Sequence, residues 1–500
     1  MQSESTLRMR ITTLLPRLAF FFCIIQPILD VIGYVQDALE IGNTITMTIR
    51  AFLLLSVSVL GFYLTGKKRV YLIFAAVVAL YLTGHILACA GNTGGYLNWV
   101  EDLIDQMRTL LLPITTLCFI TFFRENEKTV AAVKNGLFVN LCLIVLVMLV
   151  SAATGTDPHT YIEKEIGVRG WFIWSSAQSA ILSMLAPLAI VWSLERFPGK
   201  SLPLAAVSLI AFGVLFAFGT RLAFVTIPIV GLVLSVTVLL ADHRQLSQAI
   251  VIFLAAALFT ALLPLSPMVK NRSAMRVNAE TRRQRISATA TLAGAEPGAK
   301  TTDNPDVLSA TYRYNLSGLI QRFGLERVAR LYGNTLDSET ICNDRTMKAS
   351  FCRLEMEDAT KASPLSQFFG IELRRTREKA VPKYSLETDS FRQPTDPYDY
   401  YDPENDFKGV YFLCGLIGLI LLVGWIGGIG LRSGVCLLKD RKKYLQPQYM
   451  AWLLSFALAV CYAWFTVSVL RRNNASVYFA LILAVLWYQS SRKTTQRSST

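Results

Sequence analysis

The stretch from Leu202 to Ala241, "LPLAAVSLIAFGVLFAFGTRLAFVTIPIVGLVLSVTVLLA", contains a single charged side chain, that of Arg221. On either side of it lies an apolar window, 203–219 and 222–241, and about 20 apolar residues suffice to cross a bilayer core of about 30 Å. Lipid offers no hydrogen-bond partner to backbone amides, so a crossing segment of this kind must be helical. The stretch therefore predicts two membrane-spanning helices with Arg221 at their junction.

The rest of the chain repeats this pattern. Its 500 residues are 53% hydrophobic and only 17% charged, a composition too apolar for a water-soluble protein of this size. We predict an all-α fold, a polytopic membrane protein of about 12 transmembrane helices. The predicted spans cover residues 12–35, 44–66, 69–91, 104–123, 129–153, 171–194, 203–219, 222–241, 246–265, 409–431, 448–469 and 474–490.

The basic residues of the short loops predict the orientation. Lys and Arg gather in cytoplasmic loops, and here they recur on the side of Arg8 and Arg10, whereas the alternate loops carry acids such as Glu101 and Asp102. Both termini are therefore expected in the cytoplasm. The formal net charge of +14 then reflects orientation and contact with anionic lipid, and no nucleic-acid partner is expected.

Three regions follow from the spacing of the spans. Residues 1–266 hold transmembrane helices 1–9, residues 267–408 form a long extracytoplasmic loop domain, and residues 409–500 hold helices 10–12 and a cytoplasmic tail. A loop of this length indicates a small domain or a lid. It contains "CRLEMEDATK" (352–361), which we expect to be a short helix. Cys342 and Cys352 could form a disulfide on the extracytoplasmic side or remain free thiols.

Arginines lie near the predicted outer ends of several spans. A guanidinium group matches phosphate oxygens with paired donors, and a polyprenyl diphosphate carries its charged group at this depth of the membrane. The pattern predicts a site for that lipid. Snorkelling and local ion pairs, with Asp30 holding Arg50, are the structural alternative. The arginines are Arg50, Arg108, Arg169, Arg221, Arg471 and Arg472.

Acidic residues lead directly into the tenth span, in "YYDPENDFKGVYFLCGLIG" (400–418). Glu404 or Asp406 could accept the proton of an incoming hydroxyl while arginines stabilise a departing diphosphate. The alternative is that both acids only favour the helix N-terminus through the helix dipole. The chain shows no nucleotide-binding or catalytic-triad motif and has only 3 His, so neither a metal site nor a cofactor is expected.

Four segments together resemble a known family. "FFCIIQPILDVI" (21–32), "GVRGWFIWSSAQSAILSMLAPL" (167–188), "FGTRLAFVTIPIVGLV" (218–233) and "ENDFKGVYFLCGLIGLILL" (404–422) are similar in order and spacing to the O-antigen ligase and O-antigen polymerase superfamily, most of all to its Gram-positive branch. The resemblance implies a glycosyltransferase in the bacterial cytoplasmic membrane. Such an enzyme uses an undecaprenyl-diphosphate-linked glycan on the outer face, inverts the anomeric centre and needs no metal.

The resemblance also implies roles for individual residues. Arg221 of "GTR" matches the arginine that contacts the diphosphate, Glu404 and Asp406 match an acidic Glu-x-Asp element, and Arg313 of "TYRYN" matches a loop arginine. The long loop has no His, and Gly409 stands where the Gram-positive branch often has Asp. The identities of the catalytic base and of the acceptor therefore stay open. Trp171 and Trp174 could stack on sugar or anchor the chain at the membrane interface.

Three functions remain to be weighed. The first is a transferase that polymerises or ligates a lipid-linked cell-surface polysaccharide, with membrane lipid, a polyprenyl-diphosphate-linked donor and a glycan or cell-envelope acceptor as partners. A transporter or flippase of the same lipid-linked glycan would instead need ionisable groups along both halves of a pathway. A membrane scaffold for cell-wall synthesis would depend on the loop and not on the span arginines.

Overall fold

The computed structural model describes residues 2–42, 44–92, 95–273, 323–332, 344–373, 383–385, 390–392, 403–466 and 469–491. Among these residues, eleven helices are long and apolar enough to cross a membrane. The predicted all-α, polytopic membrane fold is confirmed. The twelfth predicted span corresponds to α21 (Asn473–Ser491), which has 19 residues but lies outside that set of eleven. Most of its side chains are buried against other helices, so it can carry polar residues at its ends.

The eleven helices are α1 (Gln2–Ala38), α2 (Thr44–Leu64), α3 (Lys68–Ala90), α4 (Trp99–Glu125), α5 (Lys128–Ala153), α6 (Ser175–Arg196), α7 (Ser201–Phe218), α8 (Arg221–Ala241), α9 (Leu246–Ala261), α18 (Asp406–Lys439) and α20 (Pro447–Phe465). Shorter helices are α13 (Leu325–Tyr332), α15 (Asp344–Ala362), α16 (Leu365–Phe369) and α19 (Arg441–Tyr444). A two-stranded antiparallel ribbon pairs β1 (Lys383–Ser385) with β2 (Ser390–Arg392). The short helix predicted at 352–361 lies within α15 and is confirmed.

The described chain divides into two compact units. Unit 1 comprises residues 1–75, 108–271 and 422–500, and unit 2 comprises residues 76–107 and 272–421. The predicted division at residues 266 and 409 concerns membrane topology and stays a prediction. Cys342 and Arg313 lie outside the described residues, so the disulfide and the role of Arg313 also stay predictions; Cys352 is buried on α15.

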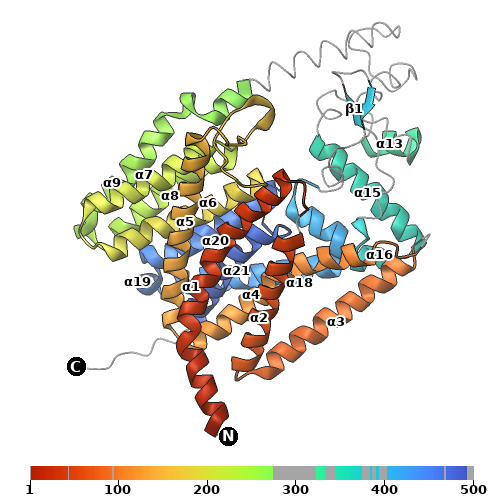
Figure 1. Ribbon diagram of the computed structural model, residues 1–500, viewed down its shortest axis with the longest axis horizontal. Coiled ribbons are helices and arrows are strands. Elements are labelled where there is room, and N and C mark those ends of the chain that lie inside the picture. The colour runs from red at the N-terminus through yellow and green to blue at the C-terminus, as the bar shows by residue number, and fades with distance from the viewer. Residues whose placement is uncertain are drawn as a thin grey trace. The chain divides into compact units, whose positions relative to one another are not determined.

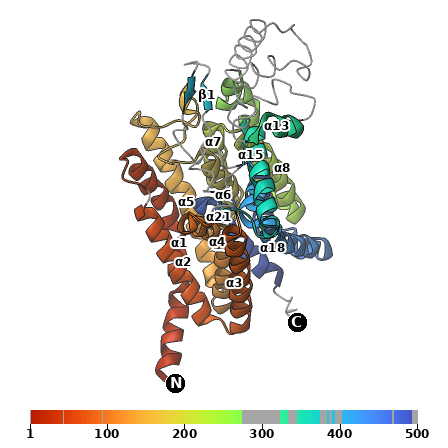
Figure 2. The ribbon, with the colours of Figure 1, turned by 90° about the vertical axis from the view of Figure 1, so that its right-hand side faces the viewer.

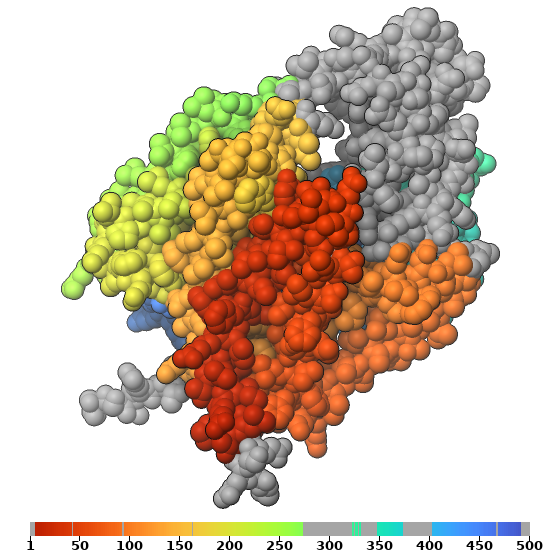
Figure 3. Space-filling model, in the orientation of Figure 1, coloured from red at the N-terminus to blue at the C-terminus, as the bar shows by residue number. Residues whose placement is uncertain are grey.

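Helix α6 forms the centre of unit 1, because α5, α7, α8, α20 and α21 all pack against it (Figures 1 and 2). In its membrane-length window 94% of the residues are buried. Small side chains such as Ala177, Ser179, Ala180 and Ser183 explain this position, since they let neighbouring helices approach closely. Helix α1 packs along α5, and both are visible side by side on the face of unit 1 drawn in Figure 3.

In unit 2, two glycines allow backbone segments to cross in direct contact. Gly370 follows α16 with φ of 93°, and Gly415 interrupts α18 with φ of 67°. A Cβ atom placed on Gly370 would lie 2.1 Å from the carbonyl oxygen of Leu413. Beside this crossing the amide of Ile371 donates a hydrogen bond to the Phe412 carbonyl at 3.0 Å. Both positions therefore require glycine for conformation and for space.

Candidate functional site

The turn between α7 and α8 places Arg221 at the first position of α8. Gly219 ends α7 in a left-handed conformation with φ of 73°. Thr220 then caps α8, because its Oγ1 accepts a hydrogen bond from the amide of Ala223 at 3.2 Å. The Arg221 side chain is exposed at this helix start. Local sequence thus fixes where Arg221 leaves the backbone, as "Gly-Thr-Arg" combines a helix stop with a helix cap.

A chain of buried hydroxyl groups holds that cap in place. Thr220 Oγ1 lies 2.5 Å from Ser179 Oγ, which lies 2.8 Å from the hydroxyl of Tyr462. The same Tyr462 hydroxyl is 2.9 Å from Ser183 Oγ. These contacts join α6, α8 and α20 directly beneath Arg221. Nothing in the one-dimensional pattern predicted this network, because its members are far apart in the sequence and are common residue types in spans.

The segment between α5 and α6 buries a second arginine. The Arg169 side chain donates from Nη1 to the Ile173 carbonyl at 3.2 Å and to Ser175 Oγ at 3.3 Å. The Asp157 carboxylate accepts instead from backbone amides, including that of Gly170 at 2.6 Å. Arg169 is only 7% exposed, and its buried Nε has no hydrogen-bond partner. Burial lowers the pKa of the Arg169 guanidinium, which nevertheless remains charged at neutral pH.

No ion pair neutralises Arg169 among the residues that the structure describes. The charges of Asp157 and Asp37 act on the guanidinium without a direct ion pair, and both Asp157 oxygens accept from backbone amides. A buried charge without a neutralising partner is costly. We therefore regard the Arg169 guanidinium as a candidate contact for an anion.

Tyr161 fastens this segment to the turn that carries Arg221. Its hydroxyl donates to the carbonyl of Gly219 at 3.3 Å. Burial raises the pKa of the Tyr161 hydroxyl, while a hydrogen bond from Asn271 and the charge of Arg221 act in the opposite direction. Arg221 is thus close enough to Tyr161 to affect its ionisation. The Tyr161 hydrogen bond thus joins the α5–α6 segment, which carries Arg169, to the α7–α8 turn, which carries Arg221. Together they form one framework within unit 1.

The other predicted residues of unit 1 have more diverse surroundings. Arg50 forms an ion pair with Asp30, as the structural alternative expected. The guanidinium of Arg472 lies 3.8 Å from the ring centroid of Trp174, so a cation–π contact covers that ring. Trp171 donates from Nε1 to Thr156 Oγ1 at 3.0 Å. Two further arginines are half-buried, one on α4 and one just before α21: these are Arg108 and Arg471.

The predicted acids belong to unit 2. Asp406 is fully buried in the first turn of α18. Asn405 caps this helix, since its Oδ1 accepts from the amide of Lys408 at 2.9 Å. Glu404 lies 3.8 Å from Lys348 Nζ. The expectation that Arg50, Arg108 and Arg221 face one cavity within reach of Glu404 or Asp406 spans both units and stays a prediction.

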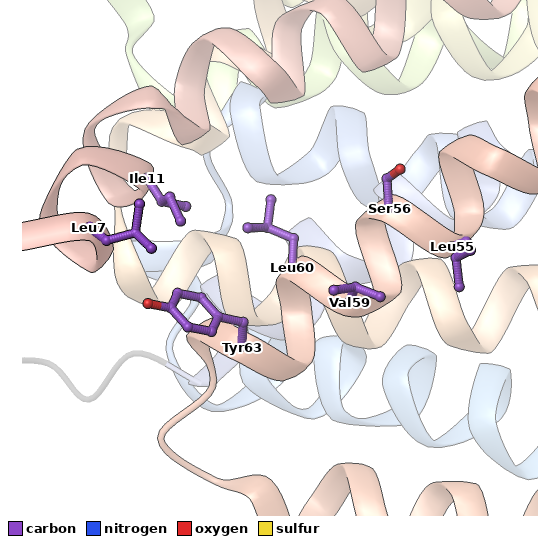
Figure 4. A pocket seen from close by; sticks show the side chains of 7 residues that line it. All are labelled: Leu7, Ile11, Leu55, Ser56, Val59, Leu60 and Tyr63. Atoms are coloured by element: carbon purple, nitrogen blue, oxygen red, sulfur yellow. The ribbon is translucent and has the colours of Figure 1, made fainter. Parts of the chain in front are cut away.

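An apolar groove runs between α1 and α2 (Figure 4). Its cavity volume is about 560 Å³, and in Figure 4 the side chains of Leu7 and Ile11 lie opposite Leu60 and Tyr63. A second cavity of about 240 Å³ shares Ser56 and Leu60 with it and extends to Leu53, one helical turn from Arg50. The groove is lined by Leu7, Ile11, Leu55, Ser56, Val59, Leu60 and Tyr63.

Sequence analysis missed a buried polar cluster in unit 2. His85 and Cys89 lie one turn apart on α3, and Asp102 lies in the first turn of α4. The ligand atoms of these three residues are all within 4.8 Å of one another. The i, i+4 spacing of His85 and Cys89 is the one signal in the sequence that could have drawn attention to them. Their pairing with Asp102 depends on how α3 and α4 pack.

Comparison with known protein families identifies the family of this chain. Residues 13–289, more than half of the chain, match the family described as O-antigen ligase like membrane protein. The chain belongs to this family. The matched segment of this O-antigen ligase-like protein includes Arg50, Arg108, Arg169 and Arg221 but ends before Glu404 and Asp406. The predicted superfamily is thereby confirmed, while its Gram-positive branch stays a prediction. No curated protein matches the chain.

Proposed function

We propose that this protein is a glycosyltransferase that polymerises or ligates a polyprenyl-diphosphate-linked polysaccharide. Membership of the O-antigen ligase-like family supports glycan transfer in the membrane. In this proposal the reaction takes place on the outer face of the bacterial cytoplasmic membrane, and both chain termini lie in the cytoplasm. The distribution of Lys and Arg in the short loops supports that orientation.

The observation that carries the proposal is the buried charge of Arg169. This guanidinium lies on the framework that also carries Arg221, and no acidic side chain among the described residues forms an ion pair with it. A diphosphate would add a direct ionic contact to the more distant charges of Asp157 and Asp37, and it would accept from Nε. Since the site is partly dry, each such contact is stronger than it would be in water.

The groove between α1 and α2 suits the lipid part of the donor. Its walls are almost entirely aliphatic and aromatic. The adjoining second cavity continues to Leu53, one helical turn from Arg50. An isoprenoid chain gains free energy from burying its surface in such a groove, while its diphosphate stays at the level of the arginines. The groove therefore supports an amphiphilic donor with a charged end.

The proposed chemistry is a single displacement at the anomeric carbon of the donor sugar. The bond from that carbon to the diphosphate oxygen breaks as a bond forms to the acceptor hydroxyl oxygen, so the anomeric configuration inverts. The electron pair leaves with the diphosphate, whose growing charge Arg169 and Arg221 stabilise. Glu404 or Asp406 takes the hydroxyl proton, and this step requires no metal ion. Trp171, Arg313, Arg471 and Arg472 are proposed to contact the glycan or the diphosphate.

Replacing Arg221 with Ala tests this proposal. We expect transfer to fall about 10–100-fold, because an exposed guanidinium contributes less stabilisation than a buried one. Purified protein in liposomes, supplied with donor and acceptor, would be assayed for release of polyprenyl diphosphate. Unchanged release at equal protein levels would contradict the proposal. A transporter would move the donor across the bilayer without releasing diphosphate at all.

Replacing Tyr462 with Phe tests the hydroxyl network beneath Arg221. The change removes the hydroxyl shared by Ser179 and Ser183, and we expect a loss of about 1–2 kcal/mol of unfolding free energy with reduced transfer. Tyr449→Phe is the matched control on the same helix, since its hydroxyl donates only to the Ser433 carbonyl. A similar loss of stability with normal transfer is expected there. Equal transfer by both variants would refute a positioning role for Tyr462.

A further inference from the structure

The His85 cluster contains an arrangement that hydrogen bonding by a neutral ring does not explain. His85 Nδ1 lies 2.7 Å from the backbone carbonyl of Phe369, which can only accept, so Nδ1 carries the proton and donates. In a neutral imidazole the lone pair is then on Nε2. That Nε2 lies 2.6 Å from Asp102 Oδ2, 3.2 Å from the side-chain amide nitrogen of Gln106 and 3.6 Å from Cys89 Sγ. A lone pair facing a carboxylate oxygen requires either a second proton or a metal ion between them.

The groups around His85, Cys89 and Asp102 resemble those that orient the ligands of a metal ion. A ligating histidine usually donates its other ring nitrogen to a carbonyl or carboxylate, as His85 does to Phe369. The Asp102 carboxylate is oriented by the hydroxyl of Tyr96, which donates to Oδ2 at 2.7 Å. Its other oxygen, Oδ1, is buried and has no hydrogen-bond partner. Asp102 is fully buried, so within the described part of the chain this oxygen is an acceptor without a donor.

We propose, against the expectation from the sequence, that His85, Cys89 and Asp102 bind a zinc ion. Imidazole nitrogen, thiolate sulfur and carboxylate oxygen are all zinc ligands, and all three residues here are buried. Tetrahedral coordination with bonds of about 2.0–2.3 Å separates ligand atoms by about 3.3–3.6 Å. The contact between Cys89 and His85 already has this length. The contact between His85 and Asp102 must lengthen by less than about 1 Å, a movement that side-chain rotation supplies.

The position of the cluster indicates a structural role. The ion would join α3, α4 and the end of α16, because the carbonyl of Phe369, the last residue of α16, is held through His85. The segment after α16 is attached to the α3–α4 connection by Glu372, whose Oε1 accepts from the amide of Asn98 at 2.6 Å. A structural ion of this kind contributes to folding free energy and does not take part in transfer. The proposal is therefore independent of the proposed transferase activity.

Elemental analysis of the full-length protein tests the proposal. The protein would be purified in detergent with an affinity tag that lacks histidine, and we expect about one zinc ion per chain. Cys89→Ser and Asp102→Asn should each reduce the zinc content to trace levels. Cys118→Ser is the matched control, since Cys118 is buried on α4, about four turns from Asp102, and is not one of the three ligands. It should retain its zinc.

Cobalt substitution gives a second test that does not require a variant to fold. Unaltered protein exchanged into Co²⁺ should show a thiolate-to-cobalt absorption band in the near ultraviolet, and Cys118→Ser should show it too. Protein without bound zinc after growth in zinc-supplemented medium, together with the absence of that band, would overturn the proposal. The cluster would then be a proton-sharing pair of His85 and Asp102.

Discussion

Replacing Arg169 with Gln is expected to reduce glycan transfer about 100–1,000-fold without lowering the stability of the protein. The guanidinium is 7% exposed and has no ion-pair partner among the described residues, so its charge is a cost to the folded state. Gln removes that cost and keeps an amide that can donate to Ile173 or Ser175. We therefore expect an unfolding free energy within about 1 kcal/mol of the unaltered protein, or above it.

The measurement pairs an activity assay with thermal unfolding in detergent. Arg196→Gln is the matched control, because Arg196 is an exposed arginine at the far end of α6 and belongs to no proposed site. It should leave both quantities unchanged. If Arg169→Gln lowered stability by several kcal/mol and activity only in proportion to the folded protein, Arg169 would be a structural residue and the proposed anion contact would be wrong.

Replacing Gly370 with Ala is expected to have the largest effect on stability, a loss of about 3–5 kcal/mol. The new Cβ would lie 2.1 Å from the Leu413 carbonyl oxygen, a backbone atom that cannot rotate away. The φ of 93° adds strain for any residue with a Cβ. The segment after α16 would have to separate from α18, with loss of the hydrogen bond from Ile371 to Phe412.

Gly424→Ala provides the control for that substitution. Gly424 lies in α18, and a Cβ there would meet no atom within 4 Å. Ala favours a helix by about 1 kcal/mol over Gly, so this variant should be as stable as the unaltered protein or more so. Thermal unfolding and limited proteolysis of both variants measure the difference. A Gly370→Ala protein that unfolds at the normal temperature would show that the crossing of the two segments is not close-packed.

Much of the candidate site was visible in the sequence because its parts are local. "Gly-Thr-Arg" at 219–221 marks a helix stop, a cap and a charge within three neighbouring residues, and the structure contains that turn. Arg169 was identified by its position before the sixth span, but its burial and the unpartnered Nε were not predictable. Those properties depend on Asp157 having both oxygens occupied by backbone amides.

The pairing of Asp30 with Arg50 illustrates the opposite case. The sequence allowed Arg50 either to contact a phosphate or to form an ion pair with Asp30. Only the packing of α1 against α2 places the side chains of Arg50 and Asp30 together. Likewise, no sequence pattern indicated the partners of His85, because Asp102 comes from a different helix and Phe369 from a segment far along the chain.

The sequence by itself determined that this chain is a helical membrane protein of the O-antigen ligase-like family. Runs of about 20 apolar residues suffice for the helical membrane fold, since backbone amides in lipid can be satisfied only within a helix, whereas the family followed from the resemblance of four segments. Only the tertiary structure decided which polar groups are paired and which are left without a partner. That outcome depends on distances between helices that no local pattern encodes. It distinguishes Arg50, which is ion-paired with Asp30, from the buried Arg169, which has no direct ion pair among the described residues.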